Sequence, residues 1–247
     1  MSSDPSMPNA GLVEAPRNRV LASLGRSDLS AIASHMEPVA LKLRENLETA
    51  HRAIRYVYFV ERGIVSVVAV GPGDPMGAEI GLIGREGMTG SAVLLGSSRS
   101  PHQTFVQVEG SAQRIGVEDL QRAMAESCAL TACFLRYAYC FAVQVAHTAR
   151  ANATGHIDER LARWLLMARD RVGDNNLPLT HDFLAVVLGV RRAGVTGALN
   201  ELHEDGVLRC KRSQIAIVSP EALRKRAGSL YGVPEAEFDR LFPKAPS

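Results

Sequence analysis

The fold is constrained most by residues 179–218, which read LTHDFLAVVLGVRRAGVTGALNELHEDGVLRCKRSQIAIV. Thr180 is a favourable N-cap for a first helix, and Gly189 follows its last apolar residue as a C-terminal turn glycine does. A second helix runs to about Gly206. Both helices carry apolar residues spaced to lie on one face: Phe183, Leu184, Val187 and Leu188, then Val195, Ala198, Leu199 and Leu202. The short runs VLRC and IAIV flank a basic turn and predict an antiparallel hairpin, which completes a winged helix-turn-helix.

The second helix leaves its polar residues on the side away from the apolar face. A helix-turn-helix inserts that side into the major groove, where Arg can read guanine and Asn adenine. A single exposed Arg or Asn is more often only solvated, so it is the order of helix, turn, helix and basic hairpin that favours DNA. The predicted DNA interface comprises Arg192, Ala193, Thr196, Gly197 and Asn200 on the helix, Arg191, Lys211 and Arg212 at phosphates, and Thr180.

The charge distribution agrees with this placement. The 247 residues carry a net charge of only +2, but residues 150–226 hold 13 Lys and Arg against 9 Asp and Glu. The basic excess therefore lies in the half with the helix-turn-helix, as an anion-binding surface requires. Four cysteines without a pairing pattern, and no sign of a signal peptide, predict a cytoplasmic protein.

The first half of the chain changes from helical to strand periodicity. Residues 1–16 are polar and proline-containing and predict a disordered arm. Residues 17–36 predict one or two short helices, and from residue 37 to about 117 β-branched runs recur between glycine-marked turns, with a split at Glu61-Arg62-Gly63. We expect a sensor domain over residues 17–118 that folds as a β-roll, a double-stranded β-helix of jelly-roll type.

Residues 119–153 predict one long helix with a single charge, Arg136, within its apolar run. Its length permits a membrane span, but Arg136, Gln144 and His147 would be costly in lipid, so no membrane is expected. A helix apolar on nearly every side is otherwise buried on every side, which favours a homodimer. The predicted dimer interface, based on seven-residue repeats, is Leu130, Cys133, Phe134, Tyr137, Cys140, Phe141 and Gln144.

A break near Thr154 marks the expected start of the DNA-binding domain, residues 154–220. Within it, IDERLARWLLMARDRV predicts a helix over residues 157–172. Residues 221–247 predict a C-terminal extension of one or two helices packed on the DNA-binding domain. The fold class expected for the whole chain is α+β.

The order of β-roll, long helix and winged helix resembles the Crp/Fnr superfamily of bacterial transcription regulators over roughly residues 20–220. The resemblance rests on YVYFVERGIVSVV, where Gly63 is the glycine of the roll, on EGMTGSAVLLG, on HIDERLARWLL and on residues 179–218. It implies a dimer that binds palindromic double-stranded DNA, with RNA polymerase as a possible further partner. It also implies regulation through the β-roll by an effector, whose identity the sequence leaves unknown.

The segment corresponding to the family's phosphate-binding loop departs from the cyclic-nucleotide pattern. Gly90 matches its glycine, but Ser91 stands where the family has the ribose-binding Glu. His102 and Gln103 stand where it has Arg and Ser or Thr for the cyclic phosphate, and Arg99 could substitute only after a register shift. A buried phosphate without its bidentate Arg lacks the main compensation for desolvation, so usual cyclic AMP binding is not expected.

The DNA-reading positions depart as well. Family members commonly read bases with Arg-Glu and a second Arg one turn later, whereas this chain has Arg192, Ala193 and Gly197. Arg192 retains the guanine-reading position, while Ala193 can contact only a thymine methyl group and Gly197 reads nothing. We therefore predict a different operator sequence.

An enzyme or a metal site is not expected. The alternative to the regulator is a cupin-like β-roll that binds a ligand or a metal, with a C-terminal domain for protein contacts. A cupin site needs a closely spaced His pair, and no His-x-His occurs. No cysteine precedes Cys128, so a family-type iron–sulfur cluster and other cofactors are not expected, and the cysteines are interpreted as small buried residues. Cys133 and Cys140 remain the candidates for a thiol sensor.

Overall fold

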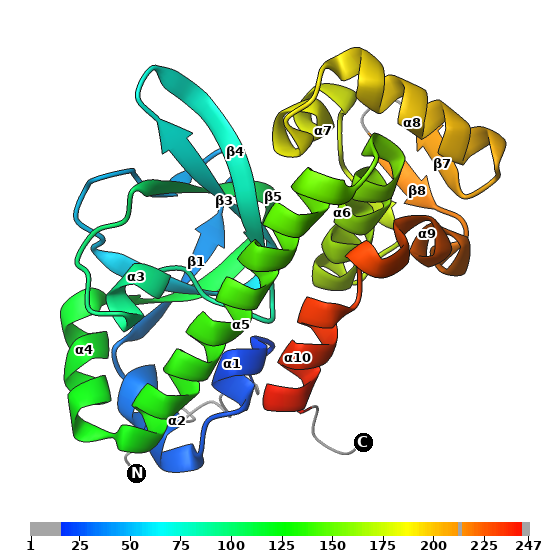
Figure 1. Ribbon diagram of the computed structural model, residues 1–247. Helices are drawn as coiled ribbons and strands as arrows, with labels where there is room; N and C mark the ends of the chain where they lie inside the picture. The colour runs from blue at the N-terminus through cyan, green and yellow to red at the C-terminus, as the bar shows by residue number, and fades with distance from the viewer. Residues whose placement is uncertain (1–15, 212–213, 244–247) are drawn as a thin grey trace, which may run out of the picture.

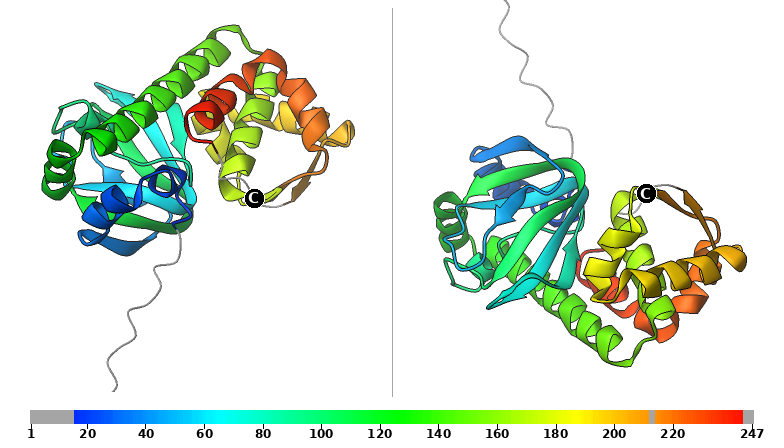
Figure 2. Two further views of the ribbon diagram at one scale, coloured as in Figure 1. Left: turned by 90° about the horizontal axis from the view of Figure 1, so that it is seen from below. Right: turned by 90° about the horizontal axis from the view of Figure 1, so that it is seen from above.

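The computed structural model describes residues 16–211 and 214–243, so the predicted arm lies outside the described residues except for Pro16. The described chain combines helices with antiparallel sheets, which confirms the predicted α+β class. Two bodies are visible, a β-roll and a helix-rich C-terminal half, and one long helix runs between them (Figures 1 and 2).

Five antiparallel strands form the roll in the order β1-β5-β3-β4, and β2 also pairs with β5. Their bounds are β1 Met36–Leu41, β2 Asn46–Glu48, β3 Tyr56–Gly71, β4 Asp74–Ile83 and β5 His102–Gly116. Buried aliphatic side chains fill the space between the strands: Leu41, Val60, Val65, Val67, Ile83 and Val106.

The predicted split at Glu61-Arg62-Gly63 is not a break, because β3 continues through it. The pairing of β3 with β5 changes register on both sides of Arg62, as a β-bulge does. Gly63 has a φ of 92°, and a Cβ there would overlap the carbonyl oxygen of Val108. Only glycine fits this backbone, and the bulge bends the strand pair so that the sheet closes on itself.

Four short helices accompany the roll: α1 Arg19–Ala22, α2 Arg26–Ala33, α3 Ser91–Leu94 and α4 Val117–Glu126. They are followed by the 27-residue helix α5, Cys128–Thr154. The single helix predicted over residues 119–153 is therefore wrong. Ser127 has an extended backbone (φ −131°, ψ 108°), and its hydroxyl accepts the Leu130 N–H at 3.1 Å, so it caps a new helix instead of continuing the old one.

Polar contacts fix α5 along the roll. The Gln144 side chain accepts the Leu82 N–H at 2.7 Å and donates to the Leu82 carbonyl at 3.1 Å, so it pairs with β4 as another strand would. The Tyr137 hydroxyl donates to the Met88 carbonyl at 2.8 Å. Five of the side chains predicted for the dimer interface belong to the core beneath the helix: Leu130, Cys133, Phe134, Tyr137 and Cys140.

The C-terminal half contains the predicted winged helix. Its elements are α6 Ile157–Val172, β6 Asn176–Leu177, α7 His181–Leu188, α8 Arg192–Glu204, β7 Leu208–Lys211 and β8 Gln214–Ile217. The expected hairpin of β7 and β8 gains a third strand, β6, in the order β6-β8-β7. The apolar residues predicted for the two helices pack together, and Trp164 of α6 lies 5.7 Å from Phe183 between ring centroids.

The C-terminal extension folds as α9 Pro220–Ala227, the short 3-10 helix η1 Gly228–Leu230 and α10 Val233–Leu241. α9 packs on α6, as predicted. α10 does not pack on the DNA-binding domain, because Phe238 and Phe242 join the core that holds α1 and α5 (Figure 1). The Arg19 guanidinium donates to Asp239 and to the Phe242 carbonyl, each at 2.7 Å. The extension therefore spans both halves of the molecule.

The two halves also meet through a buried polar contact. The Trp164 indole N–H donates to the carboxyl group of Glu79 on β4 at 2.6 Å, and the Ser66 hydroxyl lies 2.6 Å from the other carboxyl oxygen. Burial raises the pKa of Glu79 to about 7, although Ser66, Trp164 and the nearby Arg171 act in the opposite direction. A titratable group thus lies between the roll and the first helix of the DNA-binding half.

Candidate DNA-binding surface

The turn between α7 and α8 is built as its sequence predicts. The Thr180 hydroxyl accepts the Phe183 N–H at 3.2 Å, and Gly189 takes the left-handed conformation with a φ of 62°. The Arg160 guanidinium of α6 donates to the Leu188 carbonyl at the end of α7. These contacts satisfy both ends of a short helix and fix the direction in which α8 leaves the turn.

α8 buries one face and presents the other to solvent. Val195, Ala198, Leu199 and Leu202 are buried, whereas Arg192, Ala193, Gly197 and Asn200 are exposed. Thr196 is half-buried, and its hydroxyl lies 3.3 Å from Nδ1 of His181 on α7. The helix runs along the outer side of the molecule, away from the roll (Figure 1).

The positive charge of α8 lies in its first turn. Arg191 and Arg192 begin the helix, where the helix dipole adds to their charge. Arg192 pairs with Asp182 of α7 at 3.1 Å, but both side chains are about two-thirds exposed (66% and 70%). Exposed pairs of this kind contribute roughly 0–1 kcal/mol, so Arg192 can exchange this partner for another anion or a base edge at little cost.

The C-terminal end of α8 is acidic, and two of its exposed carboxylates lie beside another arginine. Glu201 and Asp205 both lie within ion-pair distance of Arg226 on α9, which also binds Asp158 at 3.0 Å. The first turn of α8 is therefore the part of this helix suited to a polyanion.

The hairpin of β7 and β8, which is the wing of the winged helix, adds cations beside α8. Lys211 is exposed at the end of β7, and Arg212 lies outside the described residues. Arg209 is also exposed on β7 and was not among the predicted contacts. The signal for it was present, because alternation in VLRC places Arg209 on the side opposite the buried Leu208.

The roll segment predicted as a degenerate effector pocket holds an internal carboxylate. Gly90 precedes α3 in the left-handed conformation (φ 76°), and its N–H donates to Glu48 at 2.6 Å. Glu48 is only 8% exposed, and burial raises its pKa while the bonds from Gly90, Thr104 and Thr89 lower it. A carboxyl group of the protein therefore occupies the backbone donor at the start of this segment.

The other predicted pocket residues are not gathered around Gly90. Ser91 begins α3, Arg99 is exposed, and Gln103 donates to Asn46 at 2.8 Å. His102 is half-buried, and burial lowers its pKa, so it is neutral at pH 7. In the described part of the chain, no ion pair or hydrogen bond links Arg99 or His102 to Gly90 or Glu48.

The predicted dimer interface requires a correction. Within a single protomer, Phe141 is half-buried and the other six residues are buried: Leu130, Cys133, Phe134, Tyr137, Cys140 and Gln144. They face the roll, the N-terminal helices and α10. The prediction selected the wrong face because α5 is apolar on nearly every side, so the sequence alone did not indicate which face packs on the roll.

A different face of α5 is apolar and exposed. Its residues follow alternating steps of four and three: Cys128, Ala132, Leu135, Tyr139, Ala142, Ala146, Ala149 and Ala153. Leu135 and Tyr139 are 42% and 53% exposed. A strict seven-residue repeat of apolar residues is the pattern by which helices pair in a left-handed coiled coil, and small residues allow their backbones to approach closely.

Burial limits the two thiols that the sequence offers as sensors. Cys133 and Cys140 are buried, and burial raises the pKa of Cys140 to about 11, so its thiol is protonated at pH 7. Across the described residues, no three His, Cys, Asp or Glu side chains are grouped to hold a metal ion. α5 is the one described helix long and apolar enough to cross a membrane, a property shared by core helices of globular proteins.

The described chain thus combines a winged helix-turn-helix with a β-roll, and a long helix joins the two. Residues 159–226 match the family model of the Crp-like helix-turn-helix domain. The chain therefore carries this domain, and its fold is that of the Crp/Fnr transcription regulators, as the sequence resemblance predicts. No curated protein matches the chain.

Solved structures support the fold. FixK2 from Bradyrhizobium japonicum is 16% identical, with a TM-score of 0.68 over 78% of this chain and 98% of its own. The regulator CLP from Xanthomonas campestris, described as responsive to c-di-GMP, is 18% identical, with a TM-score of 0.63 over 79% and 100%. TTHB099, a CRP family regulator from Thermus thermophilus, is 20% identical, with a TM-score of 0.57 over 77% and 97%.

Proposed function

We propose that the protein is a homodimeric transcription regulator that binds a palindromic DNA site in a sequence-specific manner. The observation that carries the proposal is the outward face of α8, where Arg192 and Asn200 are exposed beside a cationic first turn. Arg192 reads a guanine in each half-site, and Asn200 is placed to read an adenine. Arg191, Arg209 and Lys211 contact phosphates, which position the helix without specifying sequence.

The dimer forms through the exposed face of α5. Eight apolar residues in a strict seven-residue repeat would be an unusual surface for a monomer, and a parallel partner helix would cover all of them. The two copies of α8 then face DNA from the same side, about one helical turn apart.

Cyclic AMP does not bind the β-roll in the mode that is typical of the family. Glu48 already accepts the Gly90 N–H, and at the phosphate end of the segment His102 and Gln103 stand in place of the family's Arg and Ser or Thr. Burying a phosphate there without a paired cation would cost more than its hydrogen bonds return.

Operator selection from random duplexes, followed by binding assays on two arginine variants, tests the DNA proposal. Loss of a base-reading arginine costs about 1–3 kcal/mol at its position, so Arg192→Ala is expected to weaken operator binding and relax preference at one base pair per half-site. Arg191→Ala is expected to weaken binding to all sequences equally and to reduce the salt dependence. If Arg192→Ala binds every duplex as the parent does, Arg192 does not read a base.

The oligomeric state tests the dimer independently of DNA. Leu135→Glu places a charge in the exposed face of α5 and is expected to give monomers in light scattering after gel filtration. Leu95→Glu is the matched control, because Leu95 is 70% exposed on the roll outside that face. A monomeric parent, or a Leu135→Glu variant that remains dimeric, would exclude this interface.

A further inference from the structure

The contact between the roll and α6 contains a buried carboxyl group, that of Glu79 on β4. Glu79 is 7% exposed, and the Trp164 N–H of α6 donates to it at 2.6 Å. Ile64 and Leu82 of the roll share the apolar core of the DNA-binding half, so the two halves pack together beside this group. A charge on Glu79 would therefore lie inside the contact and out of water.

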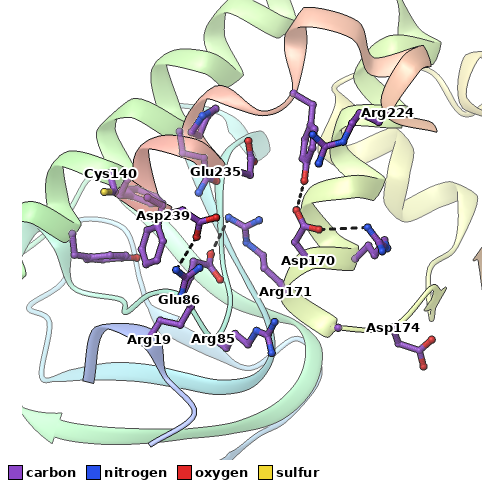
Figure 3. A pocket seen from close by; sticks show the side chains of 18 of the residues that line it. Arg19, Arg85, Glu86, Cys140, Asp170, Arg171, Asp174, Arg224, Glu235 and Asp239 are labelled. Atoms are coloured by element: carbon purple, nitrogen blue, oxygen red, sulfur yellow. Dashed lines mark hydrogen bonds and ion pairs between the residues drawn. The ribbon is translucent and has the colours of Figure 1, made fainter. Parts of the chain in front are cut away.

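The cations near Glu79 are bound to other partners. Three arginines of α6 lie around it: Arg160, Arg163 and Arg171. Arg163 donates to the Leu230 carbonyl and to the Thr148 hydroxyl, each at 3.1 Å. Arg171 pairs with Glu86 at 2.9 Å (Figure 3), and Arg160 donates to the Leu188 carbonyl. No Lys, Arg or His in the described part of the chain lies within ion-pair distance of the Glu79 carboxyl group.

The other helices beside Glu79 supply no charge. α5 contributes Thr148 and Asn152, and α7 contributes Val187 and Leu188, to a cavity of about 20 Å³ next to the carboxyl group. A space of this size holds about one water molecule, so bulk water does not solvate Glu79. An ionised Glu79 in this packing would be a buried charge without a cation, which is strongly destabilising.

The strands beside Glu79 offer Ser66 from β3 and Gln107 from β5. The Ser66 Oγ lies 2.6 Å from a carboxyl oxygen of Glu79 and 2.6 Å from Oε1 of Gln107. A hydroxyl carries one proton, so Ser66 donates to only one of these two oxygens. A proton on Glu79 supplies the second hydrogen bond, because the carboxyl group then donates to Ser66 while Ser66 donates to Gln107. Protonated Glu79 therefore satisfies the whole group.

We propose that Glu79 is a proton-dependent switch between the two halves of the molecule: the protonated carboxyl group holds α6 against the roll, and its ionisation loosens this contact. The charged carboxylate is solvated only when water enters between β4 and α6, so an arrangement in which this contact is open binds the proton less tightly than the closed one. A rise in pH therefore shifts the population towards the open arrangement.

The switch operates near neutral pH, because burial raises the pKa of Glu79 to about 7. Its effect reaches the helix-turn-helix through α6. The apolar residues of α6 share a core with those of α7 and α8, and Arg160 fixes the end of α7 through the Leu188 carbonyl. A change in the position of α6 therefore moves the helix-turn-helix relative to the roll. The effect on DNA binding rests on the proposed function, but the switch itself does not.

Acrylamide quenching of Trp164 fluorescence in the full-length protein tests the switch. Trp164 is the single tryptophan of the chain, and it is 4% exposed at the contact. Fluorescence lifetimes are measured with and without acrylamide, so that the quenching rate constant reports access to the indole ring and not a change in brightness caused by the nearby carboxyl group. We expect this rate constant to rise about threefold or more from about pH 5 to pH 8.5, with a midpoint near pH 7.

Two variants assign the transition to Glu79. Glu79→Gln does not titrate, so its quenching rate constant should stay at all pH values at the low level of the parent near pH 5. Ser66→Ala removes a hydrogen bond that a carboxylate accepts more strongly than a neutral carboxyl group does, so the midpoint should move to higher pH. Glu109→Gln, at an exposed position on β5, should follow the parent. Cooperative thermal unfolding verifies that each variant is folded.

Three results would overturn the proposal: a quenching rate constant of the parent that does not change with pH, a Glu79→Gln variant whose quenching rises as in the parent, or a midpoint in Ser66→Ala at or below that of the parent. The Ser66→Ala result stands by itself if Glu79→Gln does not fold. Failure to bind DNA with the quenching transition intact concerns only the proposed function. Normal operator binding without the transition concerns only the switch.

Discussion

The substitution Glu79→Gln is expected to remove a pH dependence of stability that originates between the two halves of the molecule. Glu79 lies against Trp164 and Ser66, with Arg171 and Arg163 nearby, and its side chain is buried. Glutamine has nearly the same shape. It can accept the Trp164 N–H and donate to Ser66, but it does not titrate.

The size of the Glu79 contribution to the free energy of unfolding follows from the change in its pKa on folding. Burial raises the pKa of Glu79 from 4.5 to about 7, which at roughly 1.4 kcal/mol per unit corresponds to about 3 kcal/mol. The folded state binds the proton of Glu79 more tightly than the unfolded state does. Protonated Glu79 therefore adds to the free energy of unfolding in full below pH 4.5, and this stabilisation is lost as the pH rises through about 7. We therefore expect Glu79→Gln to match the parent near pH 5 and to exceed it by about 1–3 kcal/mol at pH 8.

Urea unfolding, followed by Trp164 fluorescence at a series of pH values, measures the free energy of unfolding of the parent and of Glu79→Gln as a function of pH. Burial also raises the pKa of Glu48, so the difference between variant and parent, and not the parent curve alone, isolates Glu79. Glu109→Gln, at an exposed position on the roll, is the control and should follow the parent at every pH. If the Glu79→Gln and parent curves run parallel, Glu79 does not hold a proton in the folded protein.

Three further predictions follow from other parts of the structure. Cys128 is the first residue of the exposed face of α5, so mild oxidation should link two chains through it, with the covalent dimer visible on a non-reducing gel and lost in Cys128→Ser. In α8, a Cβ at Gly197 meets open space whereas one at Gly194 lies 3.1 Å from the Ile157 side chain, so Gly197→Ala should gain about 1 kcal/mol in urea unfolding and Gly194→Ala less. A larger gain at Gly194 would contradict this view of the packing. Cyclic AMP should leave the Tm of the parent unchanged, because Ser91, His102 and Gln103 stand where the family binds the ribose and the cyclic phosphate; a clear rise would show that other residues bind it.

The helix-turn-helix could be predicted because its local signals agree with its tertiary structure. Thr180, Gly189 and Gly206 mark the ends of the helices, and the positive φ values of the two glycines explain why no other residue stands there. The buried faces of α7 and α8 follow from helical spacing alone. Arg192 was found on the exposed side for the same reason, because a residue opposite a buried stripe has nowhere else to point.

Features that depend on contacts distant in sequence could not be predicted in this way. Glu48 and Gly90 are separated by 42 residues, and nothing near either one indicates the hydrogen bond between them. The face of α5 that packs on the roll is as apolar as the face that is exposed, so spacing could not distinguish them. The position of α10 depends on Arg19 at the other end of the described chain.

The path of the C-terminal extension has a consequence during synthesis of the protein. Helix α1 is synthesised long before α10, yet its core is completed only by α10, because Phe238 and Phe242 cover the same core as Val20 and Leu21. A chain that stops at Gly232 still contains the whole winged helix, but it leaves apolar surface on α1 and α5 open to water. Such a chain exposes the kind of surface that chaperones and proteases recognise. The stability of the sensor half therefore depends on a helix that follows the DNA-binding domain in sequence, and the two halves are coupled in folding as well as in packing.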